Sequence, residues 1–123
     1  MKRILIVDDA ATVRMYHSSI LESAGYRVET ALNGIEALEK ALLRPFELYL
    51  VDINMPLLDG HSFLRELRQQ KIHQAPAIMV STEADAHDRT EAYRAGANSY
   101  LVKPVTPTQL LMQVRLLLGE KRS

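Results

Sequence analysis

Cysteine is missing from the 123 residues, and so is a surplus of either sign of charge. The absence of thiols excludes a disulfide scaffold, thiolate catalysis, and zinc or iron–sulfur sites held by cysteine. The chain has 15 Lys and Arg against 15 Asp and Glu, a formal net charge of +0. A protein that coats nucleic acid non-specifically carries a basic surplus, so we expect no nucleic-acid partner.

Long apolar runs are missing as well. No run approaches the roughly 20 residues that are needed to cross a bilayer. The apolar stretch Ile4–Val7 meets two carboxylates at once, whereas the apolar region of a signal peptide needs about 7–15 residues. We therefore expect no membrane insertion and a cytoplasmic location.

The composition is that of an ordinary globular domain, with 47% hydrophobic and 24% charged residues. A chain of this length can bury enough apolar surface to form a core without disulfides. We see no internal repeat and no linker. We therefore expect one domain over residues 1–123, with a core at 3–118 and a polar tail at 119–123.

Short apolar runs that end at a polar residue recur along the chain, at residues 4–7, 48–51, 77–80 and 100–102. Continuous hydrophobicity indicates burial on both faces, which is typical of central strands in a parallel sheet. A weaker run at 26–31 alternates between apolar and polar residues, as an edge strand does.

Helical spacing of apolar residues separates these runs, for example Val13, His17, Ile20 and Leu21, with Gly25 as the stop. The other predicted helices lie near 35–42, 63–67, 84–95 and 110–118. The apolar side of 84–95 is mostly Ala, so we expect it to be the most weakly anchored helix. Strand and helix alternate five times, which predicts an α/β fold: a three-layer α/β/α sandwich around a five-stranded parallel sheet.

Polar residues follow the predicted strands: Asp8 and Asp9, Asp52, Ser81, and Lys103. The carboxyl ends of parallel strands meet at one edge of the sheet, where ligands bind in such folds. Two like charges 4 Å apart still repel by about 4 kcal/mol at an effective dielectric of 20. Three carboxylates and one ammonium sum to −2, which a divalent cation neutralises, and all-oxygen ligands favour Mg²⁺, or Mn²⁺ as a substitute. Taken singly, Asp9 could be a helix N-cap and Lys103 a surface lysine.

Four segments in order carry a family resemblance: Val7-Asp8-Asp9, Val51–Pro56 with Asp59-Gly60, Ser81, and Tyr100–Pro104. Together they resemble response-regulator receiver domains from Arg3 to about Leu118. The resemblance implies a flavodoxin-like, doubly wound sheet with strand order 2-1-3-4-5. It also implies a cis peptide bond before Pro104.

The resemblance implies that Asp52 is the phosphoryl acceptor. Asp9, Asp52 and the backbone carbonyl of Asn54 would hold Mg²⁺, and Asp8 would contribute through a water. These residue types suit the reaction, because phosphoryl transfer needs in-line positioning and neutralised oxygens more than covalent chemistry from the protein. Apart from its own phosphorylation and dephosphorylation, we expect no enzymatic activity.

The resemblance also implies a switch. Lys103 and the Ser81 hydroxyl would contact phosphoryl oxygens, and Tyr100 would turn inward when the domain is phosphorylated. Asn54 and Glu83 would border the path of the attacking water and so tune the lifetime of the phosphoryl group. The surface of the fourth helix, fifth strand and fifth helix would then change.

The expected partners are proteins. A histidine kinase or a histidine phosphotransfer protein would donate the phosphoryl group, and the switched surface would contact a downstream target. The run Asp8–Arg14 resembles stand-alone receivers of the chemotaxis type, although a receiver cut from a longer regulator would look much the same.

Two other classes of protein compete with this interpretation. A phosphatase with an aspartate nucleophile would carry Asp-x-Asp rather than adjacent Asp8-Asp9, and would usually add a cap domain. A flavin carrier would need Ser, Thr and Gly around a phosphate, which two carboxylates would repel. The four histidines form no ligand spacing, so we expect all of them on the surface: His17, His61, His73 and His87.

Overall fold

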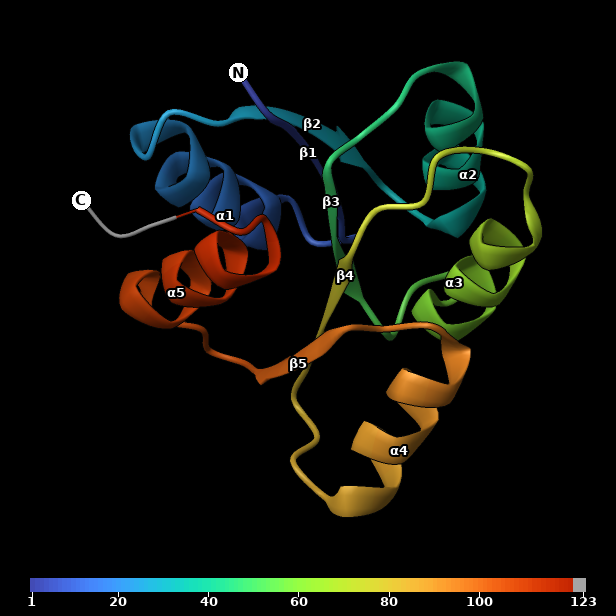
Figure 1. Ribbon diagram of the computed structural model, residues 1–123. Helices are drawn as coiled ribbons and strands as arrows, with labels where there is room; N and C mark the ends of the chain where they lie inside the picture. The colour runs from blue at the N-terminus through green and yellow to red at the C-terminus, as the bar shows by residue number, and fades with distance from the viewer. Residues whose placement is uncertain (121–123) are drawn as a thin grey trace.

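Strands and helices alternate along the whole computed structural model, which describes residues 1–120 (Figure 1). The strands are β1 Arg3–Val7, β2 Arg27–Ala31, β3 Leu48–Asp52, β4 Ala77–Ser81 and β5 Ser99–Val102. The helices are α1 Ala11–Ser23, α2 Gly34–Leu43, α3 Gly60–Gln69, α4 Ala86–Ala95 and α5 Pro107–Leu117. Of the expected polar tail, residues 121–123 lie outside the described residues. None of the described helices has the length and apolar character to cross a membrane.

The five strands form one parallel sheet in the order β2-β1-β3-β4-β5, which confirms the predicted fold class and topology. β1 lies between β2 and β3, with Ile6 opposite both Thr30 and Leu50. The crossover order puts the first and third strands side by side at the centre. The carboxyl ends of β1 and β3, where the acidic residues lie, are therefore adjacent.

Two hydrophobic cores lie on opposite faces of the sheet. Ile4 and Ile6 of β1 pack with residues of α1 and α5, whereas Leu5 and Val7 pack with residues of α2, α3 and α4. Figure 1 shows the same division, with α1 and α5 on one side of the strands and the other three helices opposite. Both faces are covered, which explains the continuous apolar runs at residues 4–7, 48–51 and 77–80.

The sheet edges follow the sequence pattern only in part. β2 is an edge strand, as its alternation predicts. β5 is also an edge strand, although its apolar run had indicated a central one. Its side chains Ser99 and Tyr100 are buried, and Leu101 is half-buried and packs against the core on the α1 and α5 side. Cover from helices on both faces thus gives an edge strand the composition of a central one.

Side-chain caps set the start of four helices. The side chains of Asn33, Asp59, Asp85 and Thr106 accept hydrogen bonds from backbone N–H groups in the first turns of α2, α3, α4 and α5. α1 begins differently, because its N-cap residue is Ala10, which has no capping side chain. Asp9 is therefore not a helix cap, which removes the structural explanation for that carboxylate.

α4 buries only Ala92 and Ala95, in agreement with the expected weak anchoring. Its C-terminal end is held more firmly, because the Arg68 guanidinium donates to the Gly96 carbonyl from both Nε (3.1 Å) and Nη2 (2.9 Å). Gly96 has a φ of 118°, and a Cβ at that position would approach Arg68 Cγ to 2.7 Å. The helix is thus fixed at its C-terminal end and loosely packed toward its start.

Candidate functional site

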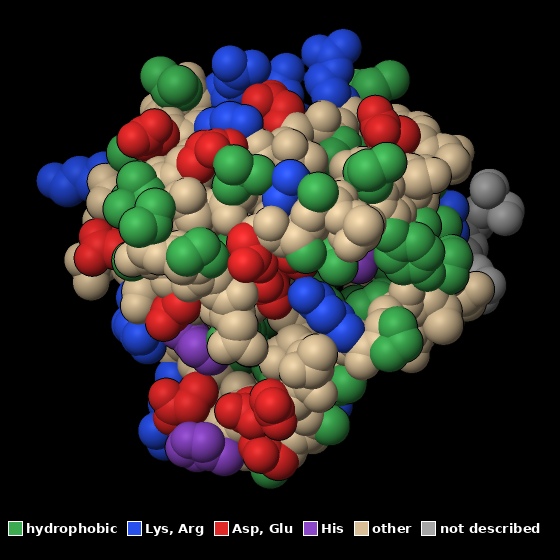
Figure 2. All heavy atoms as spheres, turned by 180° about the vertical axis from the view of Figure 1, so that it is seen from behind, with side chains coloured by type: hydrophobic (Ala, Val, Ile, Leu, Met, Phe, Trp, Pro, Cys, Tyr) green, Lys and Arg blue, Asp and Glu red, His purple; other side chains and the backbone are tan. Residues whose placement is uncertain are grey.

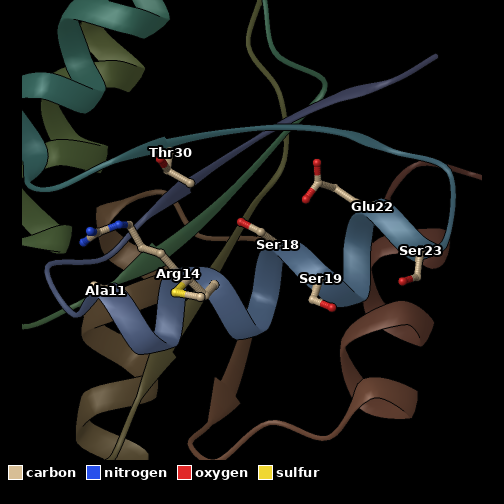
Figure 3. A pocket seen from close by; sticks show the side chains of 8 residues that line it. Ala11, Arg14, Ser18, Ser19, Glu22, Ser23 and Thr30 are labelled. Atoms are coloured by element: carbon tan, nitrogen blue, oxygen red, sulfur yellow. The ribbon is translucent and has the colours of Figure 1, made fainter.

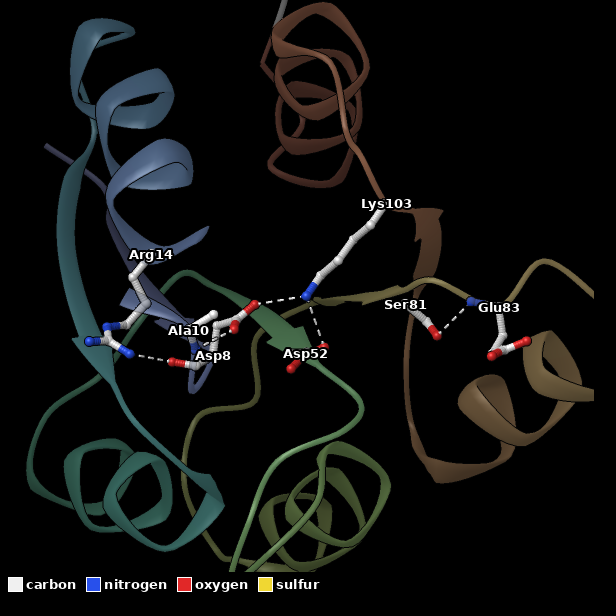
Figure 4. A network of polar contacts seen from close by, with 7 residues as sticks. All are labelled: Asp8, Ala10, Arg14, Asp52, Ser81, Glu83 and Lys103. Atoms are coloured by element: carbon white, nitrogen blue, oxygen red, sulfur yellow. Dashed lines mark hydrogen bonds and ion pairs between the residues drawn. The ribbon is translucent and has the colours of Figure 1, made fainter. Parts of the chain in front are cut away.

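The expected residues converge at the carboxyl edge of the sheet (Figure 4). Asp8 and Asp9 follow β1, Asp52 ends β3, and Lys103 follows β5. One carboxylate oxygen from each of the three aspartates lies within 4.8 Å of the other two. Residues up to 95 positions apart in the chain are therefore brought together by the parallel topology alone.

The Lys103 ammonium lies between two buried carboxylates. Its Nζ is 3.1 Å from Asp8 Oδ2 and 3.1 Å from Asp52 Oδ1. Asp8 is 2% exposed and Asp52 is 7% exposed, whereas Asp9 is exposed. The Lys103–Pro104 peptide bond is cis, as the family resemblance implied.

Burial and the charge of Asp8 raise the pKa of the Asp52 carboxyl, and they outweigh the opposing effect of Lys103. Burial also acts against the Lys103 ammonium, but the hydrogen bonds and charges of Asp8 and Asp52 outweigh it and raise the pKa of Lys103. One ammonium is thus too little positive charge for the carboxylates around it.

The acidic cluster fits a divalent cation. Three carboxylates and Lys103 leave a charge of −2, and the available ligands are oxygens, which Mg²⁺ prefers. Asp8 Oδ1 accepts from the Ala10 N–H at 2.9 Å, and Asp8 Oδ2 pairs with Lys103. Asp52 Oδ1 also pairs with Lys103, whereas the Asp9 carboxylate is exposed. Asn54 is exposed in the loop two residues after Asp52.

Hydrogen bonds of the Glu83 backbone connect Ser81 with Tyr100. The Glu83 N–H donates to Ser81 Oγ at 3.0 Å, and the Tyr100 hydroxyl donates to the Glu83 carbonyl at 2.7 Å. The Tyr100 ring is turned inward and is 5% exposed. In Figure 4 the Ser81 hydroxyl points toward Glu83 rather than toward Asp52.

Gly60 packs against the backbone of Asp52. A Cβ there would lie 2.4 Å from the Asp52 carbonyl oxygen, and the Gly60 N–H donates to the Ile53 carbonyl at 2.8 Å. Our sequence interpretation used Gly60 only as a motif residue and helix start. Leu57, in the same loop, has a φ of 70° and is exposed. The loop after Asp52 is therefore tightly folded against the strand it leaves.

The expectation that all four histidines lie on the surface is wrong for His17, which is 3% exposed. It follows Val13 and precedes Leu21 at helical spacing, so α1 turns it toward the sheet. Burial lowers the pKa of His17; the charge of Asp8 acts against this shift and that of Lys103 adds to it. His73 and His87 are exposed, and His61 is half-buried with its Nδ1 buried and unpartnered.

Arg14 is a site neighbour that sequence reasoning missed. Its Nη1 donates to the Asp8 carbonyl at 2.8 Å, whereas the sequence had shown Arg14 only as the last residue of the run Asp8–Arg14. Arg14 also lines an open hollow of about 590 Å³ beside α1 (Figure 3). Figure 3 shows hydroxyl groups along this hollow, among them Ser18, Ser19 and Thr30.

Acidic side chains dominate the surface around the cluster. Figure 2 shows one acidic group near the middle of the face and a second with histidine at the bottom, over α4. Asp85, the N-cap of α4, and His87 in its first turn are both exposed. Lys and Arg gather at the top of this view, where acidic side chains also lie among them, and further basic side chains lie along the left side.

A family comparison matches this architecture. The model of the response regulator receiver domain matches residues 4–115. The chain belongs to that family. Receiver domains accept phosphoryl groups in two-component signalling and bind Mg²⁺ at an acidic site, and in this receiver the acidic site is the cluster of Asp8, Asp9 and Asp52.

Curated relatives are longer than this receiver. The transcriptional regulatory protein ResD of Bacillus subtilis is 35% identical over 116 residues, which cover 94% of this chain and 48% of ResD. The probable transcriptional regulator ycf27 of Cyanophora paradoxa is 38% identical over 117 residues, which cover 95% of this chain and 48% of that protein. This receiver thus spans about half the length of these curated relatives.

Solved structures match it almost end to end. The chemotaxis protein CheY4 of Vibrio cholerae has a TM-score of 0.90 at 37% identity, covering 95% of this chain and 98% of that chain. The receiver domain of the sensor histidine kinase PA1611 from Pseudomonas aeruginosa has a TM-score of 0.90 at 32% identity, covering 97% and 98%. That structure holds a magnesium ion coordinated in its active site cleft.

Proposed function

We propose that this receiver accepts a phosphoryl group on the Asp52 carboxylate in a Mg²⁺-dependent reaction. The donor would be the phosphohistidine of a histidine kinase or of a phosphotransfer protein. The observation that carries this proposal is the position of Asp52, buried at the sheet edge within 4.8 Å of two further carboxylates and 3.1 Å from the Lys103 ammonium.

In the proposed reaction an Asp52 carboxylate oxygen attacks phosphorus as the P–N bond to the donor imidazole breaks. The bonding electron pair stays on the imidazole nitrogen, which takes up a proton. The product is an acyl phosphate, which water hydrolyses to the free carboxylate and inorganic phosphate. Lys103 stays protonated because its pKa is raised, so it can neutralise a phosphoryl oxygen throughout.

Asp9, Asp52 and the backbone carbonyl of Asn54 would hold Mg²⁺, with Asp8 acting through a water. When bound, the ion would neutralise phosphoryl oxygens that this chain leaves unpaired. Asn54 follows Asp52 by two residues and Glu83 follows Ser81 by two, and both are exposed, which suits side chains that regulate the approach of water. We expect substitutions there to change the dephosphorylation rate and not the fold.

Output would pass through the face formed by α4, β5 and α5. The Ser81 hydroxyl accepts a hydrogen bond from Glu83 and would donate one to a phosphoryl oxygen. Movement of Ser81 toward the phosphoryl group would then displace Glu83, whose carbonyl accepts from the Tyr100 hydroxyl. The loosely packed start of α4 suits a surface that moves. We propose a protein as the target; control of chemotaxis is one form that this output could take.

The test is incubation with acetyl phosphate and Mg²⁺, followed by intact mass measurement. We expect one added phosphoryl group that hydroxylamine removes, no addition in EDTA, and none in Asp52→Asn. As a control, the hydrolysis of p-nitrophenyl phosphate by the wild type is measured. We expect it to be slow, whereas a phosphatase would hydrolyse this phosphoester rapidly. Labelling that persists in the Asp52→Asn variant, or rapid multiple turnover of the phosphoester, would contradict the proposal.

A further inference from the structure

Arg89 contacts Tyr100 across the gap between α4 and β5. Its guanidinium carbon lies 5.0 Å from the centre of the Tyr100 ring. Arg89 is half-buried in the first turn of α4, and the tyrosine is almost fully buried. A guanidinium within about 6 Å of an aromatic ring face is attracted by the ring quadrupole, more strongly when water is excluded.

Arg89 contacts the Tyr100 ring although acidic residues lie close to it in the sequence. Asp85 caps α4 through its bond to the Asp88 N–H, and Glu91 pairs with Arg94 at 3.5 Å. None of the ion pairs found among residues 1–120 includes Arg89. The guanidinium thus faces an aromatic ring in preference to the carboxylates of its own helix.

The ring that Arg89 contacts is joined to the phosphoryl site by two hydrogen bonds. The Tyr100 hydroxyl donates to the Glu83 carbonyl, and the Glu83 N–H donates to Ser81 Oγ. Tyr100 is therefore held at two points, its ring by Arg89 and its hydroxyl by Glu83. The contacts form a continuous path from the first turn of α4 to the end of β4.

We propose that Arg89 is a positioning residue that holds Tyr100 inward before any phosphoryl group is present. Arg89 thereby shifts the equilibrium between the inward and outward orientations of Tyr100 toward the inward one. A phosphoryl group that contacts Ser81 then has to supply less free energy to turn Tyr100 inward. The first part concerns the orientation of Tyr100 alone. The second part, the effect on phosphoryl binding, rests on the proposed function.

The experiment labels tyrosine with 3-fluorotyrosine and follows the ¹⁹F resonance of Tyr100 without phosphodonor. The chain has 5 Tyr, and the Tyr100→Phe variant identifies the relevant signal. The variants are Arg89→Met, which keeps the length and helix propensity of the side chain without its charge, and Arg89→Lys, which keeps the charge on a poorer partner for the ring. Arg94→Met is the matched control, because Arg94 lies on the same helix and pairs with Glu91 instead.

In the wild type and in Arg94→Met we expect a resonance that does not shift between H₂O and D₂O, as for a buried ring. In Arg89→Met we expect a solvent-sensitive or broadened resonance, with Arg89→Lys between the two. Circular dichroism checks that α4 remains folded. An unchanged Tyr100 resonance in folded Arg89→Met would overturn the proposal, and so would an equal change in Arg94→Met.

Titration with beryllofluoride, a phosphoryl mimic, in Mg²⁺ tests the second part. We expect Arg89→Met to bind it about threefold to tenfold more weakly than the wild type, in line with the strength of a cation–π contact. Equal affinity, despite an altered Tyr100 resonance, would contradict the coupling to Ser81. If the wild type binds no beryllofluoride, the proposed function fails, while the ¹⁹F experiment still decides the role of Arg89.

Discussion

Two cationic side chains sit in the body of this receiver, one at each end of the sheet, and their surroundings are opposite in kind. Lys103 lies at the carboxyl edge between the carboxylates of Asp8 and Asp52. Arg68 lies at the amino edge, where it donates to the carbonyls of Gly96 and Ala75 and to side-chain amide oxygens. One cation has charged partners, and the other has neutral dipoles.

The pKa values move in opposite directions for this reason. Burial lowers the pKa of Arg68. The pKa of Lys103 is raised in spite of burial, because two carboxylates face it. A cation that is satisfied by fixed backbone groups joins segments of the fold. Lys103, in contrast, belongs to a cluster of charges in which the carboxylates outnumber the ammonium group, so the cluster keeps a net negative charge.

The largest effect is expected from Lys103→Met. This change removes the ammonium and keeps most of the apolar stem, so phosphorylation by acetyl phosphate should slow by about 10²- to 10³-fold, the usual effect of removing one group that stabilises developing charge. Time-resolved mass measurement of the phosphorylated fraction checks this. A rate within a factor of three of the wild type would mean that Lys103 serves only the fold.

Arg68→Met should show the reverse pattern. The variant leaves the Gly96 and Ala75 carbonyls without their donors, and we expect the free energy of unfolding to fall by about 3 kcal/mol. Urea denaturation measures this loss, and the rate of phosphorylation of the folded fraction should not change. A variant of unchanged stability, or one that folds normally but phosphorylates slowly, would break the contrast between the two cations.

The smallest change in stability is expected from Asp52→Asn, which should stabilise the metal-free receiver by about 1 kcal/mol at pH 7 by removing an unfavourable buried charge. The pKa of Asp52 is raised above 3.8, so the folded chain binds this proton more tightly than the unfolded chain does. The ionised carboxylate therefore destabilises the fold at neutral pH, and the destabilisation disappears as the pH falls through the raised pKa.

Thermal unfolding in EDTA from pH 7 to pH 4 measures the difference between the two proteins. The advantage of Asp52→Asn should shrink as the pH falls. Added Mg²⁺ should raise the stability of the wild type more than that of the variant. A variant less stable than the wild type at pH 7 would show that Lys103 more than compensates the buried carboxylate.

The sequence predicted the acidic cluster because the topology of a parallel sheet places every strand end at one edge. It did not predict the strand order, which came from the family resemblance. The position of His17 was mistaken because its residue type was weighed above its helical spacing. The contact between Arg89 and Tyr100 had no sequence signal, since it depends on how α4 packs against β5, which the periodicity of either element does not determine.

The assembly of the acidic edge also has a consequence during synthesis. Asp8 and Asp52 leave the ribosome well before Lys103, which follows Asp8 by 95 residues. A nascent chain that lacks β5 holds the Asp52 carboxylate without its ammonium partner. At about 5–20 residues per second, several seconds separate the two events. The contacts of Lys103 with Asp8 and Asp52 therefore form only after β5 has been translated.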